Sequence, residues 1–506
     1  MSRRYSLSGK SRRDWDGNFK SRFQRKNSIE PEVVVNESPV KWCAVALSDV
    51  VARGKRLEAS VFDVEAKQAR MLISKGKYPQ SFIGGADGMA SSYVCGRFKR
   101  IWVEKSDMPI YQPSSIVDIK PTPDGYISAK TKTHIDNLRV KENQILMTCS
   151  GTIGKVSFVS RTLANKIFSH DLLRIDCRKP DEAGYIYAFL KSKIGNKILL
   201  TNSYGAVITH IEPEHLATVP IPDAPTMLKK KIHDLIVRSY ELRDESNDLI
   251  DQATALLIDE LKLPDIDAFD VGLYKKAAPV DTFSVRLSKM SGRLDASYHV
   301  PIVNAIVEHL RQHAEEVTTI GDPRISREVI LPGRFKRVYV DEGYGRVFIG
   351  GKQLYELDPT NKKYLSNVHH GDRISRQLEL HENMTLITCS GTIGKVALVG
   401  KHWENWTANQ HIIRILPAGE DIAGYLNIFL ASDYGKVLIT RFTYGSVVDE
   451  IDDNHVRQIA IPLLKNHTIQ KKINDLALEA NEKRYQAYLL EQEALQIMDK
   501  DVIYAK

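Results

Sequence analysis

Leucines recur every seven residues through one long, mostly polar stretch of this chain. They stand at Leu228, Leu235, Leu242, Leu249, Leu256 and Leu263, and a second series between them reads Ile232, Ser239, Ser246, Ala253 and Glu260. An apolar repeat of this period predicts a coiled-coil helix over 226–263, which would be about 50 Å long. Pro225 and Pro264 stand at its two ends, as expected for helix boundaries.

The end of the chain carries a second heptad pattern, over 466–500. One series is Ile469, Leu476, Lys483, Leu490 and Ile497, and the other is Ile473, Ala480, Ala487 and Ala494. The two stretches align position for position at an offset of 241 residues. Because small side chains beside large ones let two helices approach closely, we expect these helices to pack on each other. A globular segment lies between them, which favours an antiparallel pair. The alternative is that each helix packs only on its own domain.

The remainder of the chain is duplicated. Residues 148–156 and 388–396 have the same nine-residue sequence, Thr-Cys-Ser-Gly-Thr-Ile-Gly-Lys-Val, and Gly-Arg-Phe-Lys-Arg occurs at 96–100 and again at 333–337. Short apolar runs on both sides of each glycine turn predict strand–turn–strand units. The segments 183–200 and 423–439 have helical spacing. A repeat this long indicates two globular domains related by a pseudo-twofold axis, a symmetry that duplex DNA shares.

These patterns predict an α+β fold with two duplicated mixed α/β domains separated by two long antiparallel coiled-coil helices. The expected order is a basic, disordered tail at 1–36, a first domain at 37–225, a first long helix at 226–263, a linker at 264–290, a second domain at 291–465 and a second long helix at 466–500.

The net charge of +8 is concentrated in the tail, because residues 1–26 hold nine lysines and arginines against two aspartates. The tail is either an arm that binds phosphates or a flexible solubilising extension. No run of 18 apolar residues and no secretory signal occurs, so we expect a cytoplasmic protein that does not enter a membrane. The five cysteines form no Cys-x-x-Cys pair, and we expect no metal.

No catalytic motif is complete. The chain lacks an amino-methyltransferase motif, a dinucleotide-binding glycine loop and a zinc-hydrolase His-Glu-x-x-His sequence. Asp124 and Glu142 match a metal-dependent nuclease pattern only in part, because its lysine is missing. A stand-alone nuclease therefore stays open as an alternative, as does an adaptor whose two domains bind proteins.

The repeated motifs resemble those of the specificity (S) subunits of type I restriction-modification systems. The resemblance rests on Arg-Leu-Asp-Ala-Ser-Tyr at 293–298, the Ser-Gly-Thr-Ile-Gly-Lys turns at 150–155 and 390–395, and the Tyr-Gly-x-Val segments at 204–207 and 444–447. It covers about residues 40–500. The opening at 56–62 is a looser version of the motif, and the basic tail is not a usual part of the family. A related phage-defence system is therefore the alternative setting.

The resemblance implies a non-catalytic subunit with two target-recognition domains. Each domain would read one half of a bipartite site on double-stranded DNA, and the helices would set the gap and dock two methyltransferase subunits. Those partners would use S-adenosylmethionine to methylate adenine, and a restriction subunit using ATP and Mg²⁺ would join in some complexes. No cofactor is expected in this chain.

Candidate DNA-binding residues fall into two groups. Those in equivalent repeat positions suit phosphate contacts, with occasional guanine reading by arginine. They are Arg97, Lys99, Arg100, Ser150, Thr152 and Lys155, with Arg334, Lys336, Arg337, Ser390, Thr392 and Lys395. Positions that differ between the copies suit base reading, and these are Ser169-His170-Asp171 against Asn409-Gln410-His411, and Thr209-His210 against Asp449-Glu450. The alternative for both groups is an ordinary solvated strand face or strand edge.

Overall fold

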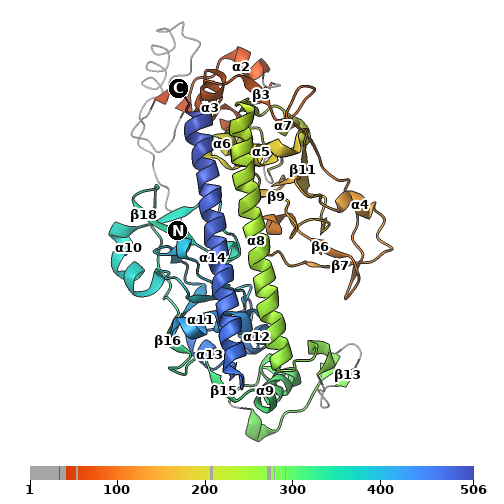
Figure 1. Cartoon of the computed structure of the whole chain (residues 1–506), viewed down its shortest axis with the longest axis vertical. Helices are drawn as coiled ribbons and strands as arrows, with labels where there is room; N and C mark the ends of the chain where they lie inside the picture. Colours follow the sequence, from red (N-terminus) through yellow and green to blue (C-terminus); the bar gives the residue numbers. More distant parts are fainter. Residues whose placement is uncertain are drawn as a thin grey trace, which may run out of the picture.

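Two long helices run side by side and antiparallel through the centre of the molecule (Figure 1). They are α8 (Thr226–Glu260) and α14 (His467–Ile497), and α14 continues into a π-helical turn, η10 (Met498–Ile503). The computed structural model describes residues 33–34, 42–52, 55–57, 59–205, 209–269, 275–277, 280–290 and 292–505. Most of the basic tail predicted at 1–36 lies outside the described residues. The predicted antiparallel pair of helices is confirmed.

Small side chains form the centre of the seam between α8 and α14. Ser239 Oγ donates to the Ala487 carbonyl at 2.7 Å, which sets the register of the pair. In that register the facing pairs, all 0% exposed, are Ile232 with Ala494, Ser239 with Ala487, Ser246 with Ala480, and Ala253 with Ile473. Most of the leucine series flanks this seam and is only half-buried. The helices therefore approach closely through serine and alanine, as the alternation of bulk predicts.

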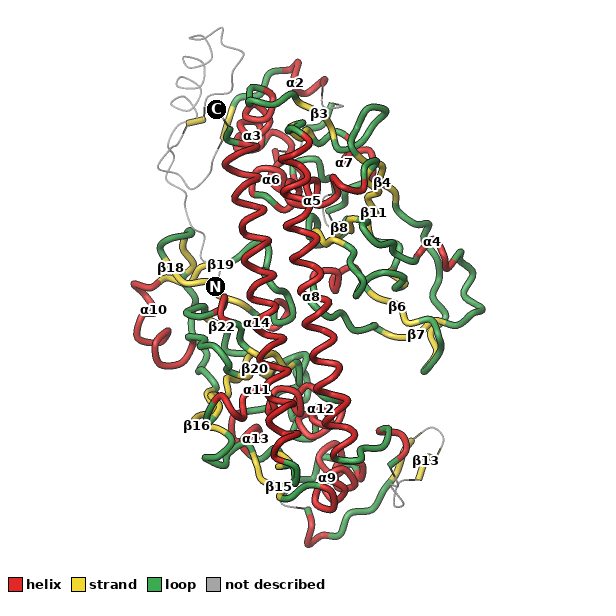
Figure 2. The backbone as a smooth tube through the Cα atoms, viewed as in Figure 1, coloured by secondary structure: helices red, strands yellow, loops and turns green. Residues whose placement is uncertain are grey.

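Strands lie on both sides of the helix pair (Figure 2). Within the described residues each module has two four-stranded sheets and a two-stranded sheet, with the same topology in both copies. In the first module the sheets are β4-β11-β8-β9, β10-β6-β7-β5 and β12-β3. Their strands are β3 (Gln80–Phe82), β4 (Ala90–Tyr93), β5 (Trp102–Val103), β6 (Pro109–Tyr111), β7 (Gly125–Ile127), β8 (Ile145–Thr148), β9 (Val156–Phe158), β10 (Ile167–Phe168), β11 (Leu172–Cys177) and β12 (Pro220–Pro222).

The second module repeats this arrangement as β16-β23-β20-β21, β22-β18-β19-β17 and β15-β24. Its strands are β15 (Glu316–Thr319), β16 (Ser326–Ile330), β17 (Tyr339–Val340), β18 (Gly345–Ile349), β19 (Lys363–Ser366), β20 (Thr385–Thr388), β21 (Val396–Leu398), β22 (Thr407–Ala408), β23 (Ile412–Pro417) and β24 (Ala460–Leu463). In each copy a single parallel pair, β10 with β6 and β22 with β18, stands among antiparallel ones. The predicted α+β class and duplication are confirmed.

Shorter elements complete the modules and their connection. The helices are α2 (Leu47–Ala52), α3 (Val64–Ser74), α4 (Ile135–Leu138), α7 (Pro213–Ala217), α9 (Pro301–His313), α10 (Asn367–Arg373) and α13 (Asp453–Arg457). Two antiparallel strand pairs, β1 (Val33–Val34) with β2 (Trp42–Cys43) and β13 (Lys275–Ala277) with β14 (Val280–Thr282), lie outside the main sheets.

The helical segments expected at 183–200 and 423–439 are each broken in two. The observed helices are α5 (Ala183–Lys191) with α6 (Lys193–Leu200), and α11 (Glu420–Ala431) with α12 (Asp433–Thr440). The break falls at Ser192 and at Ser432, which adopt an extended backbone and accept a hydrogen bond from the amide of Gly195 or Gly435. The single-helix expectation was wrong here because a serine N-cap starts a new helix without interrupting the apolar spacing.

Each long helix packs on both modules as well as on the other helix. One core cluster joins the first module to Ile232 and Ile236 of α8 and to Ala494 of α14. Another joins the second module to Ala253 of α8 and Ile473 of α14. The pair is therefore part of both hydrophobic cores, and this arrangement holds the modules on opposite sides of the helices (Figure 1).

The modules also touch each other beside the helices. Asp118 and Glu356 form an isolated antiparallel bridge, and the Ile119 amide donates to the Tyr355 carbonyl at 2.9 Å. Asn247 of α8 donates to the Ile119 carbonyl at 3.0 Å. Asp118 and Glu356 are equivalent in the repeat, as the matching pairing of β6 with β10 and of β18 with β22 shows, so the bridge between them lies at the pseudo-twofold axis. The spacing of the modules is thus set by this contact together with the helices.

Candidate nucleic-acid interface

A basic loop of the first module meets a short segment that we call the link. The loop joins β4 to β5 and carries Arg97, Lys99 and Arg100, of which Arg97 and Lys99 are exposed. The link, residues 169–171, joins β10 to β11. The Phe98 ring packs edge-on against the His170 ring with centroids 5.6 Å apart. Burial lowers the pKa of His170, Asp171 raises it, and Arg100 and Arg97 lower it further. The predicted basic and base-reading candidates are therefore neighbours.

The second module brings the equivalent residues together by direct contacts. Arg337 Nη2 donates to Gln410 Oε1 at 2.8 Å, so its basic loop (334–337) touches its link, residues 409–411. The Nε2 atom of Gln410 also lies 3.0 Å from the Nε2 atom of His411. Burial and the nearby Arg337 and Arg334 lower the pKa of His411. Lys336 is exposed, like Lys99.

The glycine turns lie beside His210 in the first module and Glu450 in the second. Ser150 bridges His210, and Ser390 bridges Glu450. Gly151 and Gly391 have φ of 72° and 76°, a left-handed conformation that favours glycine. Thr152 and Thr392, next to these glycines, are exposed.

The two clusters differ in charge where His210 is replaced by Glu450. Arg334 Nη2 lies 3.2 Å from Glu450 Oε1, so part of the positive charge of the second cluster is neutralised. At the equivalent place, the first cluster has a histidine. We define cluster 1 as Arg97, Lys99, Arg100, Ser150, Thr152, His170 and His210, and cluster 2 as Arg334, Lys336, Arg337, Ser390, Thr392, Asn409, Gln410 and Glu450.

Lys155 and Lys395 do not join these clusters. Lys155 Nζ lies 2.6 Å from Glu356 Oε1 of the other module, and Lys395 Nζ lies 4.9 Å from the centroid of the Tyr355 ring. Both therefore face the contact between the modules, and a phosphate contact by Lys155, which stays a prediction, would require its ion pair to open. Their repetition has a structural explanation, since equivalent lysines flank the same pseudo-twofold contact.

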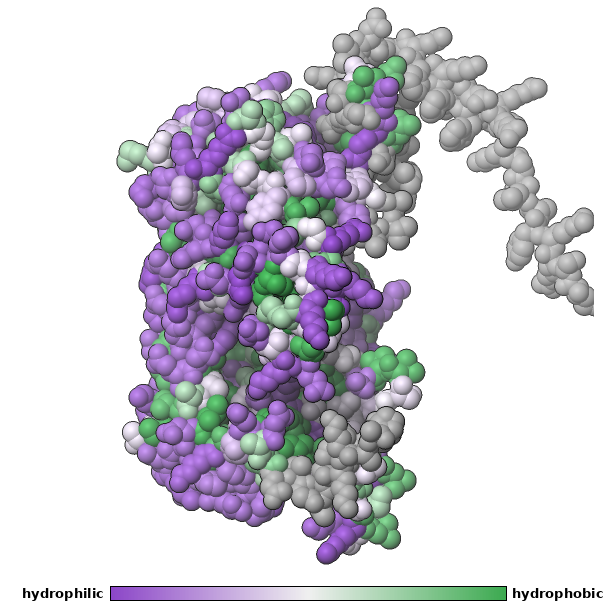
Figure 3. Space-filling view, turned by 90° about the vertical axis from the view of Figure 1, so that its right-hand side faces the viewer, coloured by the Kyte–Doolittle hydropathy of each residue, from purple (hydrophilic) through white to green (hydrophobic). Residues whose placement is uncertain are grey.

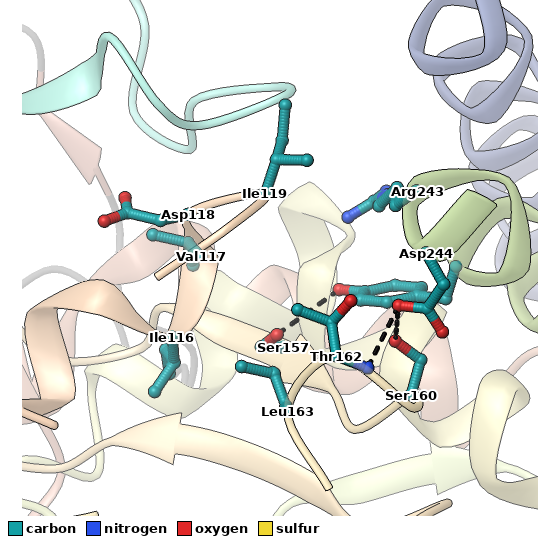
Figure 4. Close-up of a pocket in the computed structure, with 11 residues that line it drawn as sticks. Ile116, Val117, Asp118, Ile119, Ser157, Ser160, Thr162, Leu163, Arg243 and Asp244 are labelled. Atoms are coloured by element: carbon teal, nitrogen blue, oxygen red, sulfur yellow. Dashed lines mark hydrogen bonds between the residues drawn. The ribbon is translucent and has the colours of Figure 1, made fainter. Parts of the chain in front are cut away.

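A small pocket lies between this contact and α8. Asp118 and Ile119 line this pocket, in which Asp244 accepts hydrogen bonds from Ser160 Oγ (2.9 Å) and the Thr162 amide (3.1 Å) (Figure 4). Burial raises the pKa of Asp118 to about 7, with Glu356 acting in the same direction and Lys395 and Lys155 opposing it.

Asp118→Asn is expected to remove a pH-dependent part of the stability. The folded-state pKa of Asp118 lies above its unfolded value, so the wild-type free energy of unfolding falls as pH rises from about 5 to about 7. The slope from this group approaches about 1.4 kcal/mol per pH unit. Because asparagine does not ionise, the free energy of unfolding of the variant should rise relative to that of the wild type as pH rises over this range. Urea denaturation of both chains between pH 5 and pH 8 measures the difference, and a difference that is independent of pH would contradict this role.

Sequence reasoning missed two buried arginines behind the links. Arg174 and Arg414 are 0% exposed, and both donate to backbone carbonyls of the link and its neighbours. A signal was present in the sequence: Leu-Leu-Arg-Ile at 172–175 and Ile-Ile-Arg-Ile at 412–415 place an arginine in the same apolar strand of both copies.

Within the residues that the structure describes, no group of three or more His, Cys, Asp or Glu side chains is placed to hold a metal ion. Over the same part of the chain, no helix is long and apolar enough to cross a bilayer. The side of the molecule seen in Figure 3 is largely hydrophilic, with scattered apolar areas.

No protein-family model matches the chain, and no curated protein matches its sequence. Solved structures do match. One is the S subunit of the type I restriction-modification system from M. genitalium, with 13% identity over 81% of this chain and 94% of that chain, at a TM-score of 0.25. The HsdS subunit from Thermoanaerobacter tengcongensis matches with 12% identity over 84% of this chain and 100% of that chain, at 0.26. A third structure, reported for the assembly and conformational transition of the type I R-M system, matches with 13% identity over 81% and 97%, at 0.26.

Proposed function

We propose that this chain is the DNA sequence-specificity subunit of a type I restriction-modification complex. Each module reads one half of a bipartite site on double-stranded DNA, and the chain itself carries out no chemistry. The helix pair and the contact between the modules set the gap between the half-sites. Two methyltransferase subunits, which supply S-adenosylmethionine chemistry, dock on the chain, and restriction subunits that use ATP and Mg²⁺ complete the complex.

The observation that supports this proposal most is that the two modules share one backbone arrangement but carry different side chains on their links. In both modules a basic loop, a glycine turn and a link meet at equivalent positions. Arginine and lysine at repeated positions suit phosphates, which are the same for every sequence. The links read Ser-His-Asp in one copy and Asn-Gln-His in the other. Asparagine and glutamine can form paired hydrogen bonds with adenine. Because the two links carry different side chains, the two modules suit a site whose halves differ in sequence.

The duplication also matches the symmetry of the target. Two modules related by a twofold axis approach the two strands of a duplex in equivalent ways, and the methyltransferases would be placed equivalently as well. The basic clusters are small, which suits a subunit whose partners supply part of the phosphate contacts.

Removing the positive charges of either cluster is expected to lower the affinity for DNA and to make that affinity less dependent on salt. Arg97→Ala/Arg100→Ala and Arg334→Ala/Arg337→Ala should each reduce the slope of log K against log salt by about 0.9 for every phosphate that the variant no longer neutralises. Fluorescence anisotropy with duplex DNA across a salt series, using the full chain, measures this slope. Lys231→Ala/Lys472→Ala is the matched control, because it removes the same charge from exposed positions on the long helices. Equal slopes for the cluster variants and this control would overturn the assignment of the interface.

A further inference from the structure

Each module contains a fully buried arginine whose guanidinium, among the described residues, donates hydrogen bonds only to backbone carbonyls. Arg174 of β11 donates to the carbonyls of Leu172 (3.1 Å), Leu138 (3.2 Å), Phe168 (3.2 Å) and Ser169 (3.4 Å). Arg414 of β23 donates to those of Ile412 (2.5 Å), Leu378 (3.3 Å), Asn409 (3.1 Å) and Ala408. All four acceptors of one arginine are the repeat equivalents of the four acceptors of the other.

The buried charge is costly, which points to a role beyond filling space. Both side chains are 0% exposed, and neither has a carboxylate partner among the residues that the structure describes. The Nε atoms of both arginines lack a hydrogen-bond acceptor in the same part of the chain. Burial lowers the pKa of Arg414 to about 9, so the group is still charged at neutral pH. A leucine or methionine would fill the site without this desolvation cost.

The planar, five-donor guanidinium is suited to joining segments that no strand ladder joins. In the first module it connects the end of α4 (Leu138), the end of β10 (Phe168), the link (Ser169) and the start of β11 (Leu172). The link crosses between the two four-stranded sheets, because β10 and β11 belong to different ones. The arginine therefore holds the backbone at the point where the chain changes sheet.

The backbone around the buried arginine is arranged in the same way in both modules, but the side chains on the link differ at every position. We propose that Arg174 and Arg414 are positioning residues for DNA reading, each holding the link of its own module in the conformation that presents 169–171 or 409–411 to the bases. This inference rests on the proposed function. Each arginine then controls the specificity of one half-site and leaves the other half-site unaffected.

The test uses Arg174→Lys, Arg174→Met, Arg414→Lys and Arg414→Met, each introduced at the genomic locus so that the cell supplies the partner subunits. Lysine retains the charge but not the planar fork, and methionine removes both. Sequencing of methylated bases gives the recognised motif. A well-read base is discriminated about 5- to 150-fold. We expect this preference to fall several-fold in one half-site for the Arg174 variants and in the other half-site for the Arg414 variants, with an unchanged gap.

Arg178→Lys and Arg327→Lys are the controls, one for each module. Both are exposed arginines that donate to a backbone carbonyl, of Gly85 at 2.7 Å and of Ala418 at 2.8 Å, away from the links. They should leave the motif unchanged. An unaltered motif in the Arg174 and Arg414 variants, or equal relaxation of both half-sites by each variant, would overturn the positioning role. Failure of both lysine variants to accumulate as folded protein would assign the arginines to folding and overturn it too. Absence of any bipartite motif in the wild type would instead overturn the proposed function.

Discussion

Replacing Glu491 with glutamine is expected to lower the free energy of unfolding by about 3–5 kcal/mol. Glu491 of α14 is 0% exposed and lies 2.8 Å from Lys191 Nζ of α5 and 3.1 Å from Arg243 Nη2 of α8. The hydroxyl of Tyr187 donates to the same carboxylate. Burial raises the pKa of Glu491, but Lys191 and Arg243 lower it more, to about 2. The amide would leave two buried cations without a counter-charge.

This cluster joins both long helices to the first module only. The position equivalent to Glu491 in the other half is Ile250, so the second module lacks the carboxylate. Chemical denaturation of Glu491→Gln and of Glu493→Gln, an exposed control on the same helix, measures the effect. The control should change stability by less than about 0.5 kcal/mol. Equal shifts in the two variants would show that the buried carboxylate is not needed to hold the helices to the module.

Patterns that repeat along the chain were sufficient to predict the architecture. The heptads at 226–263 and 466–500 predict two long helices because an apolar stripe of that period needs a partner, and the duplicated glycine turns predict equivalent strands. The alanine stripe at Ala480, Ala487 and Ala494 predicts the close approach that the structure shows, with all three residues at the centre of the seam.

Contacts between distant segments could not be predicted in the same way. Lys155 ends a repeated turn, and nothing in the spacing says that its side chain reaches Glu356 of the other module rather than solvent. Arg174 lies in a strand that is buried on both faces, whereas an arginine among apolar residues suggests an outward position on a half-exposed strand. The serine caps at Ser192 and Ser432 were missed because helical spacing continues on both sides of them.

Replacing the second module with a copy of the first is expected to convert the recognised site from two different halves to an inverted repeat of one half. The repeats align Arg56 with Arg293 and Pro222 with Pro462, so residues 56–222 can stand in place of 293–462. The long helices are retained except for Ile250→Glu, which gives the second copy of Lys191 the carboxylate that Glu491 supplies to the first. Each copy of the first module would carry Arg174 and the Ser-His-Asp link. Because the helix seam is unchanged and the contact between the modules lies at the pseudo-twofold axis, the gap should be retained. A melting curve checks that this symmetric chain folds.

The most direct measurement is the sequence of methylated bases in cells that express the natural chain or this symmetric chain from the genomic locus. For the natural chain we expect one motif with two unlike blocks at a constant gap, and no such methylation when the chain is deleted. For the symmetric chain we expect one of those blocks repeated in inverted orientation at the same gap. Methylation that does not depend on the chain, or a motif that stays asymmetric after the exchange, would show that the two modules do not each read one half-site.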